Sequence, residues 1–199
     1  MMEQAILLPT AYLPGLHYLK HVLKAETTVL EAHEHFVKQT HRNRCEILTA
    51  NGRLALSIPL VKQADKEITA HKRISYAENW QQQHWRTISS AYKNSPYFEF
   101  FEDDLRPFYE QKYELLLDYN TALLKTILHI LRVKKQLRFT EGYEPEPFGI
   151  TDLRDADGQM AAAPVKPHYQ VFSIGAAFVP GLSCIDALFN IGLETKLIE

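Results

Sequence analysis

Residues 31–48, EAHEHFVKQTHRNRCEIL, hold the densest set of side chains that could do chemistry: three histidines, one lysine, two arginines and one cysteine. His33 and His35 alternate, so on a strand both imidazoles would face the same side, with Glu34 and His41 near them. A zinc site needs three or four ligands in a tetrahedral array, and this spacing matches no standard motif such as His-Glu-x-x-His. We therefore expect surface or hydrogen-bonded histidines here and no metal site.

The arginines of this stretch suggest an anion site. If the strand that contains Cys45 extends backward, Arg42 and Arg44 project from one face and Asn43 from the other. Two guanidinium groups about 7 Å apart suit a phosphate or a carboxylate, and Lys38 could add a point charge. The same positive charges would also protect an exposed strand edge from aggregation. The spacing alone leaves both interpretations open.

His84 is the candidate general base. On a helix it shares a face with the apolar residues Trp80, Ile88 and Ala91. A histidine with such neighbours is either a hydrogen-bonded core residue or a base that faces a pocket. From the residues alone, core packing is the better interpretation, because no partner is in sight.

The elements that must position these residues begin with a strand, a helix and a second strand. Residues 4–10 form an apolar run, residues 13–25 place apolar side chains at helical spacing, and residues 27–31 are rich in β-branched side chains. This order predicts a βαβ unit and at least a partly parallel sheet.

Residues 45–60, CEILTANGRLALSIPL, predict a β-hairpin. Asn51 and Gly52 tolerate the positive φ angles of a type I′ turn, and a two-residue loop at this point pairs Cys45 with Ile58. The register puts five side chains on one face: Cys45, Ile47, Leu54, Leu56 and Ile58. We therefore expect Cys45 in the core rather than as a nucleophile, and we expect the same of Cys184, which begins a helix between apolar neighbours.

Helices and one long loop account for much of the remaining chain. Ser75 and Glu78 have the spacing of a capping box, which predicts a helix running to about Lys93. Apolar residues at helical spacing predict a long amphipathic helix near 108–133, and a Pro- and Gly-rich loop spans 141–168. The predicted fold class is α/β: a small mixed sheet with a β-hairpin, packed by several helices, in a single domain over residues 1–199.

Composition excludes several classes of protein. The net charge of −2 provides no basic field for nucleic acid. The first residues lack the basic region and the long apolar run of a signal peptide, and two cysteines make no disulfide framework, so we expect a cytoplasmic protein. We expect no membrane span, because polar residues interrupt the apolar segment 115–131.

Four segments of the chain together resemble the WbqC-like family: residues 7–26, 33–60, 79–110 and 169–192. They combine Arg-Asn-Arg before a hairpin, His-Trp followed by Pro-Tyr-Phe, and a terminal Leu-Phe-Asn helix. The resemblance covers nearly the whole chain. It departs from the family pattern in the loop 153–167, and at Cys184, where an aliphatic residue is common.

The resemblance implies a transferase of bacterial surface-polysaccharide (O-antigen) biosynthesis. Family members lie in such gene clusters, and some are proposed to transfer glycine to an amino sugar. By this resemblance His84 is the general base, Lys38 and Arg44 hold a phosphate or carboxylate of a small-molecule substrate such as a nucleotide sugar, and no particular cofactor or oligomeric state is implied. The substrate-binding positions that match are Tyr12, Lys38, Asn43, Arg44, Tyr92, Tyr97 and Gln170, and the tyrosines could stack on a sugar ring.

Other interpretations stay open. The chain could be a non-catalytic binding protein for a nucleotide sugar or another phosphate-bearing ligand, or these residues could all be structural. In addition, a strand, a loop with Pro14 and His17, a helix and a second strand are similar to nucleotidyltransferase-like α/β folds, which could activate an amino acid with ATP. No Gly-His pair follows His17, so this is an analogy of fold only.

Overall fold

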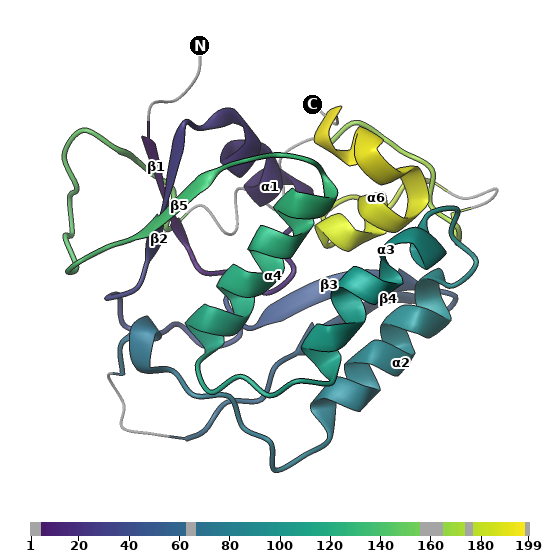
Figure 1. Cartoon of the computed structure of the whole chain (residues 1–199), viewed down its shortest axis with the longest axis horizontal. Helices are drawn as coiled ribbons and strands as arrows, with labels where there is room; N and C mark the ends of the chain where they lie inside the picture. Colours follow the sequence, from purple (N-terminus) through teal and green to yellow (C-terminus); the bar gives the residue numbers. More distant parts are fainter. Residues whose placement is uncertain (1–4, 63–66, 156–164, 174–176, 198–199) are drawn as a thin grey trace.

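A four-stranded parallel sheet forms one end of the molecule (Figure 1). The computed structural model describes residues 5–62, 67–155, 165–173 and 177–197. The strands lie in the order β5-β2-β1-β6, with the bounds β1 Ala5–Pro9, β2 Thr27–Glu31, β5 Gln136–Phe139 and β6 Thr151–Asp152. β1 is apolar throughout and buried from its second residue onward, as expected for a parallel strand that is covered on both faces.

Helix α1 (Leu16–Lys24) connects β1 to β2 and makes them parallel neighbours. Its apolar residues Leu19 and Val22 are buried, whereas Lys24 is exposed. The predicted βαβ unit and parallel pairing are therefore confirmed.

The hairpin is present as β3 (Arg44–Thr49) and β4 (Gly52–Ser57), but its predicted register is wrong by two residues. Thr49 pairs with Gly52, so the turn residues are Ala50 and Asn51. The Thr49 hydroxyl donates to the Gly52 carbonyl oxygen (2.9 Å) and accepts from the Asn51 amide (3.2 Å), which fixes the turn one residue earlier than the Asn-Gly pair suggested.

The slip of two residues leaves the same side chains facing inward, because side chains alternate along a strand with a period of two. Cys45, Ile47, Leu56 and Ile58 are buried as predicted. Leu54 is not: it lies near the tip of the hairpin and is 42% exposed.

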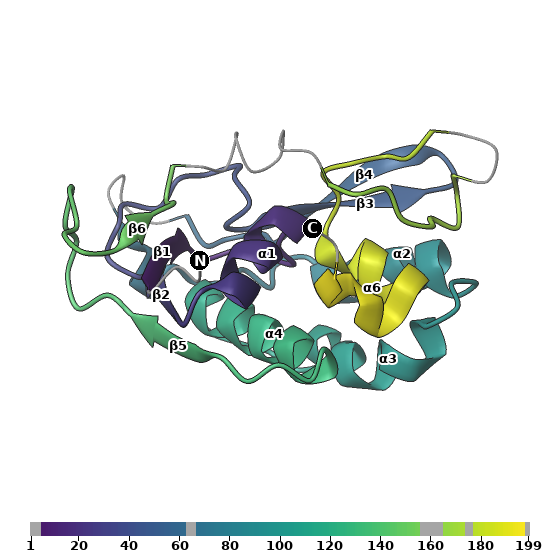
Figure 2. The same cartoon turned by 90° about the horizontal axis from the view of Figure 1, so that it is seen from above.

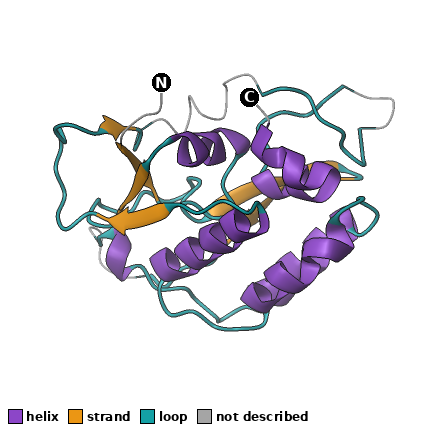
Figure 3. Cartoon of the chain, turned by 45° about the horizontal axis from the view of Figure 1, so that its top comes forward, coloured by secondary structure: helices purple, strands orange, loops and turns teal. Residues whose placement is uncertain are grey.

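Helices pack around the sheet and the hairpin (Figure 3). In Figure 1, α4 lies between the parallel sheet and the group formed by α2, α3 and α6. One cluster of buried apolar side chains includes residues of β1, of the hairpin and of all these helices. The predicted α/β class is thus confirmed. The α-helices are α2 (Trp80–Tyr92), α3 (Phe98–Leu105), α4 (Leu116–Ile130) and α6 (Cys184–Ile191), and the 3-10 helices are η1 (Thr69–His71), η2 (Arg106–Tyr109) and η3 (Gly192–Leu197).

Helix α2 ends where the sequence predicted but begins later. Its N-cap residue is Asn79, so Ser75 and Glu78 do not form the predicted capping box. Ser75 instead donates its backbone amide to the Pro59 carbonyl oxygen (2.8 Å), which keeps it in an extended segment.

The long helix expected near 108–133 is α4, and it begins only at Leu116. The residues before it pair with residues 72–74: the Ile74 amide donates to the Glu114 carbonyl oxygen (3.0 Å), and the Leu116 amide donates to that of Lys72 (2.9 Å). This pairing holds residue 115 in an extended conformation and delays the helix.

The stretch 141–168, predicted as a loop, contains the short strand β6, and its residues 156–164 lie outside the described ranges. The last helix begins as predicted, with Ser183 as its N-cap residue, and Gly192 ends it at a φ of +60°. Across the ranges described, no helix is long and apolar enough to span a membrane.

Candidate functional site

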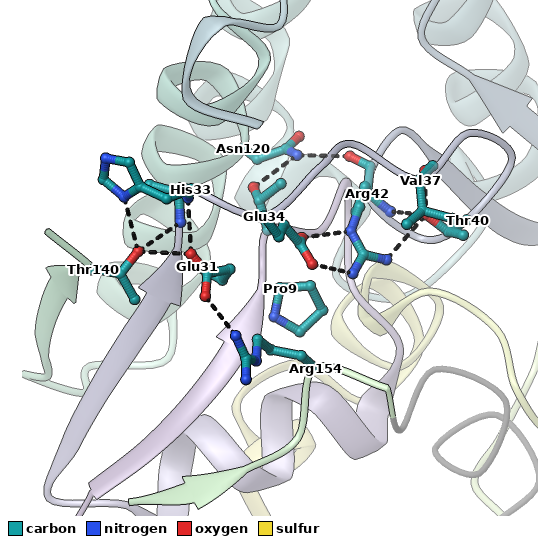
Figure 4. Close-up of polar contacts among 12 residues, drawn as sticks. Pro9, Glu31, His33, Glu34, Val37, Thr40, Arg42, Asn120, Thr140 and Arg154 are labelled. Atoms are coloured by element: carbon teal, nitrogen blue, oxygen red, sulfur yellow. Dashed lines mark hydrogen bonds and ion pairs between the residues drawn. The ribbon is translucent and has the colours of Figure 1, made fainter. Parts of the chain in front are cut away.

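The carboxyl ends of the parallel strands meet at one edge of the sheet, and polar side chains gather there (Figure 4). From β1 the chain passes through α1 to β2, whereas β6 pairs with the opposite side of β1. The strand order therefore reverses at β1. In open parallel sheets, ligands bind in the crevice outside the carboxyl ends of the strands at such a point.

A buried ion-pair network joins the strands at this edge. The fully buried Glu31, at the end of β2, accepts a hydrogen bond from Arg154 Nη1 (2.9 Å) on one oxygen and from the Thr140 hydroxyl (2.8 Å) on the other. Arg154 Nη2 also donates to Asp152 Oδ2 (2.6 Å). Burial alone would raise the pKa of Asp152, but the hydrogen bonds and charge of Arg154 outweigh it and lower that pKa.

A second buried pair fixes the stretch that crosses this edge. Arg42 donates from Nε to Glu34 Oε1 (2.7 Å) and from Nη2 to Glu34 Oε2 (2.8 Å), and the arginine is 3% exposed. Arg44 points to solvent and lies 3.9 Å from Glu46. The hypothesis of Arg42 and Arg44 as a two-guanidinium anion cradle is therefore wrong, because a bidentate carboxylate already occupies Arg42.

A pocket opens where β1 ends and α1 begins. The backbone amide of Tyr12 donates to the His41 carbonyl oxygen (2.9 Å), and that of Cys184 donates to the Pro14 carbonyl oxygen (2.7 Å). These bonds hold together three segments that are far apart in the sequence. The residues that line the pocket are Ala11, Pro14, Gly15, Leu16, His17, Tyr18, His41, Val165, Gly181 and Leu182. We call it the carboxyl-edge pocket.

Two imidazoles, those of His17 and His41, lie in this mainly apolar pocket. His17 is in the first turn of α1, whose N-cap residue Gly15 offers no capping side chain. The first-turn amides of a helix carry partial positive charge and suit an anion, and an imidazole can donate or accept a hydrogen bond or move a proton. The described residues contain no group of three or more side chains able to hold a metal ion.

His84, the predicted base, is buried among aromatic rings. Its Nδ1 lies 3.0 Å from the Tyr12 hydroxyl, which is also 3.0 Å from the Tyr109 hydroxyl. Burial lowers the pKa of His84 to about 4, against the opposing effect of a hydrogen bond to the Ser57 backbone, so its imidazole is neutral at pH 7. The structure thus brings Tyr12 and His84 together, but His84 does not line the carboxyl-edge pocket.

Tyr92 and Gln170 meet at Asp186. The Asp186 carboxylate is buried and accepts from the Tyr92 hydroxyl (3.1 Å), Gln170 Nε2 (2.8 Å) and, when that nitrogen carries its proton, His168 Nε2 (2.9 Å). Tyr92 also accepts from the Leu48 amide (3.2 Å). Two of the predicted binding residues are therefore parts of one buried network.

The other predicted binding residues are dispersed. Lys38 and Arg44 are exposed, and the Asn43 side-chain amide donates to the Ile58 carbonyl oxygen (3.0 Å). Tyr97 is partly exposed and stacks on Phe101, with a centroid separation of 6.2 Å. None of these lines the carboxyl-edge pocket, and their part in binding stays a prediction.

The two cysteines are buried and free, as expected. Burial raises the pKa of the Cys184 thiol to about 12 and that of Cys45 well above its usual value. Neither thiol is a nucleophile at neutral pH, because the thiolate is the reactive form.

The sequence did not single out the pocket histidines. His41 was grouped with the surface histidines, and His17 entered only through a fold analogy. The available signal was position: His17 follows a buried parallel strand by eight residues, at the start of the next helix.

Comparison with known proteins agrees with the resemblance that the sequence motifs suggested. The model of the WbqC-like protein family matches residues 10–147, which include the loop after β1, both pocket histidines and His84. The chain belongs to the WbqC-like family. This WbqC-like chain is also 22% identical to "Uncharacterized protein Rv1507c" of Mycobacterium tuberculosis, over 97% of this chain and 96% of that protein. No solved structure matches it significantly.

Proposed function

We propose that this WbqC-like protein is a transferase of bacterial surface-polysaccharide biosynthesis that binds a phosphate-bearing substrate in the carboxyl-edge pocket. The observation that carries the proposal is the position of the pocket: it lies at the strand where the sheet order reverses, against the first turn of α1, and holds two histidines. Family membership supports the polysaccharide context.

The first turn of α1 and the two pocket histidines suit the anion. A phosphate placed at the first turn of α1 would meet backbone amides and the positive end of the helix dipole, which contributes about 0.3–1 kcal/mol. His17 and His41 would each add a hydrogen bond, and a bond to a charged group contributes about 1.5–3 kcal/mol. The pocket has a volume of only about 30 Å3, so it would take the phosphate group, and the rest of the ligand would lie outside it.

The reaction that fits the family is acyl transfer from a phosphate-activated glycine to an amino sugar. The amine nitrogen attacks the carbonyl carbon of the glycyl group, and the phosphate leaves with the electrons of the broken C–O bond. Each pocket histidine donates a hydrogen bond to the leaving phosphate from one ring nitrogen, and the other ring nitrogen of one of them accepts the proton that the amine loses. His84 would act through Tyr12, whose loop forms one wall of the pocket, because its Nδ1 already meets the Tyr12 hydroxyl.

A binding protein without catalysis is the second candidate. The burial of His84 favours it, since the base implied by the family resemblance does not reach the pocket. Both candidates require the same phosphate site and differ only in turnover.

The test is isothermal titration with a panel of nucleotide sugars and with glycyl-adenylate analogues. His17→Ala and His41→Ala should each weaken binding at least tenfold, because each removes a hydrogen bond to a charged group. The matched control is His129→Ala, which removes an exposed histidine on α4. If no ligand gives a binding heat, or if the heats are equal in the wild type and all three variants, phosphate binding in the carboxyl-edge pocket is refuted. Binding without glycyl transfer would select the second candidate.

A further inference from the structure

A second concave surface lies at the far end of strand β3. An open groove of about 350 Å3 separates the hairpin tip from one face of α2 and from the turn that holds Phe172. Its size falls within the range of small-molecule sites. Among the residues that the structure describes, the groove and the carboxyl-edge pocket share no lining residue. The lining residues are Thr49, Ala50, Asn51, Leu54, Arg86, Thr87, Ser90, Ala91 and Phe172.

The groove combines an apolar platform with hydrogen-bonding groups. Phe172 is 37% exposed and Leu54 42% exposed, which is unusual for large apolar side chains inside a concave surface. Arg86 and Ser90 are one turn apart on α2, so they lie on the same face of the helix. Asn51 adds an exposed amide at the hairpin tip. An aromatic face beside hydroxyl, amide and guanidinium groups is complementary to a sugar, which has an apolar C–H face and a rim of hydroxyl groups.

The charge of the groove narrows the class of sugar. Arg86 is exposed and forms no ion pair with any residue in the described ranges. Among the described residues that line the groove, none has an acidic side chain. A guanidinium binds a carboxylate through two parallel hydrogen bonds, so an acidic sugar fits this groove better than a neutral one.

The buried network around Asp186 holds the three walls of the groove in place. Through Tyr92 it reaches the Leu48 amide, which adjoins Thr49 of the hairpin, and Tyr92 itself adjoins Ala91 of α2. Through Gln170 it reaches the turn of Phe172, where the Ser173 amide donates to the Gln170 carbonyl oxygen (2.9 Å). Figure 2 shows the segment that leads into α6 running beside the β3–β4 hairpin. The walls are thus fixed before any ligand binds, which lowers the entropy lost on binding.

We propose that this groove binds a sugar that carries a carboxylate, such as a uronic acid, with Phe172 against the sugar ring and Arg86 on the carboxylate. Tyr92, Gln170 and Asp186 are positioning residues that hold the walls without touching the sugar. The proposal goes beyond the transferase function, because it requires neither a phosphate nor a reaction.

The experiment compares two probes, methyl glucuronide and methyl glucoside, which differ only at C6: the first has a carboxylate there and the second a hydroxymethyl group. Protein-observed NMR titration of the full chain should show shifts for the hairpin tip and α2, with the glucuronide bound roughly threefold more tightly, as expected for an exposed charge pair. Arg86→Gln should abolish this preference while the glucoside still binds. Phe172→Ala should weaken the binding of both sugars. Lys93→Gln, an exposed lysine at the end of the same helix, is the matched control.

The positioning role has its own readout. Gln170→Leu should weaken the binding of both sugars while the threefold preference for the glucuronide remains, because Arg86 keeps its place and Phe172 does not. Thermal unfolding reports whether the variant is folded. The proposal that the groove binds an acidic sugar would be overturned if neither sugar causes chemical-shift changes, or if the preference for the glucuronide survives Arg86→Gln. His17→Ala should bind both probes as the wild type does, so failure of the groove and failure of the carboxyl-edge pocket are distinguishable.

Discussion

Arg154 links β2 to β6 through a buried guanidinium, and we predict that Arg154→Met lowers the free energy of unfolding by about 3–5 kcal/mol. Methionine keeps most of the side-chain volume but removes the hydrogen bonds to Glu31 Oε2 (2.9 Å) and Asp152 Oδ2 (2.6 Å). Glu31 is fully buried and would keep partners only on its other oxygen, from the Thr140 hydroxyl and the His33 amide. The large effect comes from this uncompensated buried charge.

Most of the loss should arise at Glu31 rather than at Asp152. The side chain of Asp152 is 33% exposed, so water can solvate its carboxylate once the arginine is gone, whereas the side chain of Glu31 is 0% exposed. Removing the charge of Glu31 as well should therefore recover stability. We expect Glu31→Gln combined with Arg154→Met to be less destabilised than the sum of the two single variants.

Urea denaturation followed by circular dichroism measures the effect. With a slope of about 2 kcal/mol per molar urea, the midpoint of Arg154→Met should fall by roughly 1.5–2.5 M. The control is Arg73→Met, which removes a surface pair to Glu114 of similar length (2.9 Å) and should change the midpoint little. Equal midpoints for the two variants, or strict additivity in the double variant, would refute the idea that buried charge at the carboxyl edge dominates.

Two further predictions concern pH and backbone conformation. The pKa of His84 is lowered from 6.5 to about 4. Between these pH values the unfolded state therefore binds a proton that the folded state does not. The free energy of unfolding should fall by up to about 3 kcal/mol as the pH drops through this window. His84→Gln should flatten that part of the profile in urea titrations at several pH values, and an unchanged slope would contradict a buried neutral imidazole. Gly192→Ala should lower Tm by about 4–8 °C, because the φ of Gly192 is +60° and a new Cβ would lie 2.7 Å from Tyr97 Cε1. Gly142→Ala is the control, since its Cβ would meet nothing within 4 Å, and equal shifts in calorimetry would argue against this strain.

Local sequence patterns were enough to predict the strands and the helix of the βαβ unit. The apolar run of β1, the helical spacing of α1 and the β-branched β2 each match the structure, because a parallel βαβ unit buries these residues in one consistent way. The inward face of the hairpin was also predictable, since alternation survives a slip of two residues.

The ends of strands and helices that depend on contacts beyond the local sequence pattern were not predictable. The Asn51-Gly52 pair favoured a turn at those residues, but the Thr49 hydroxyl satisfies the turn one residue earlier. Residues before α4 have helical spacing, yet backbone pairing with residues 72–74 holds Leu115 extended. The carboxyl-edge pocket could not be predicted either, because contacts between residues 12 and 41 and between residues 14 and 184 close it.

Four of the residues carried over by family resemblance fall into two buried networks, and this pattern bears on how those four act. Tyr12 and His84 meet beneath the loop that forms one wall of the carboxyl-edge pocket. Tyr92 and Gln170 meet at Asp186, behind the walls of the groove. A buried side chain with all its bonds made inside the protein controls a ligand only through the surface that it supports. Substitutions in either network should therefore change binding at the adjoining surface and leave the other surface intact, whereas residues of a single shared active site would affect both.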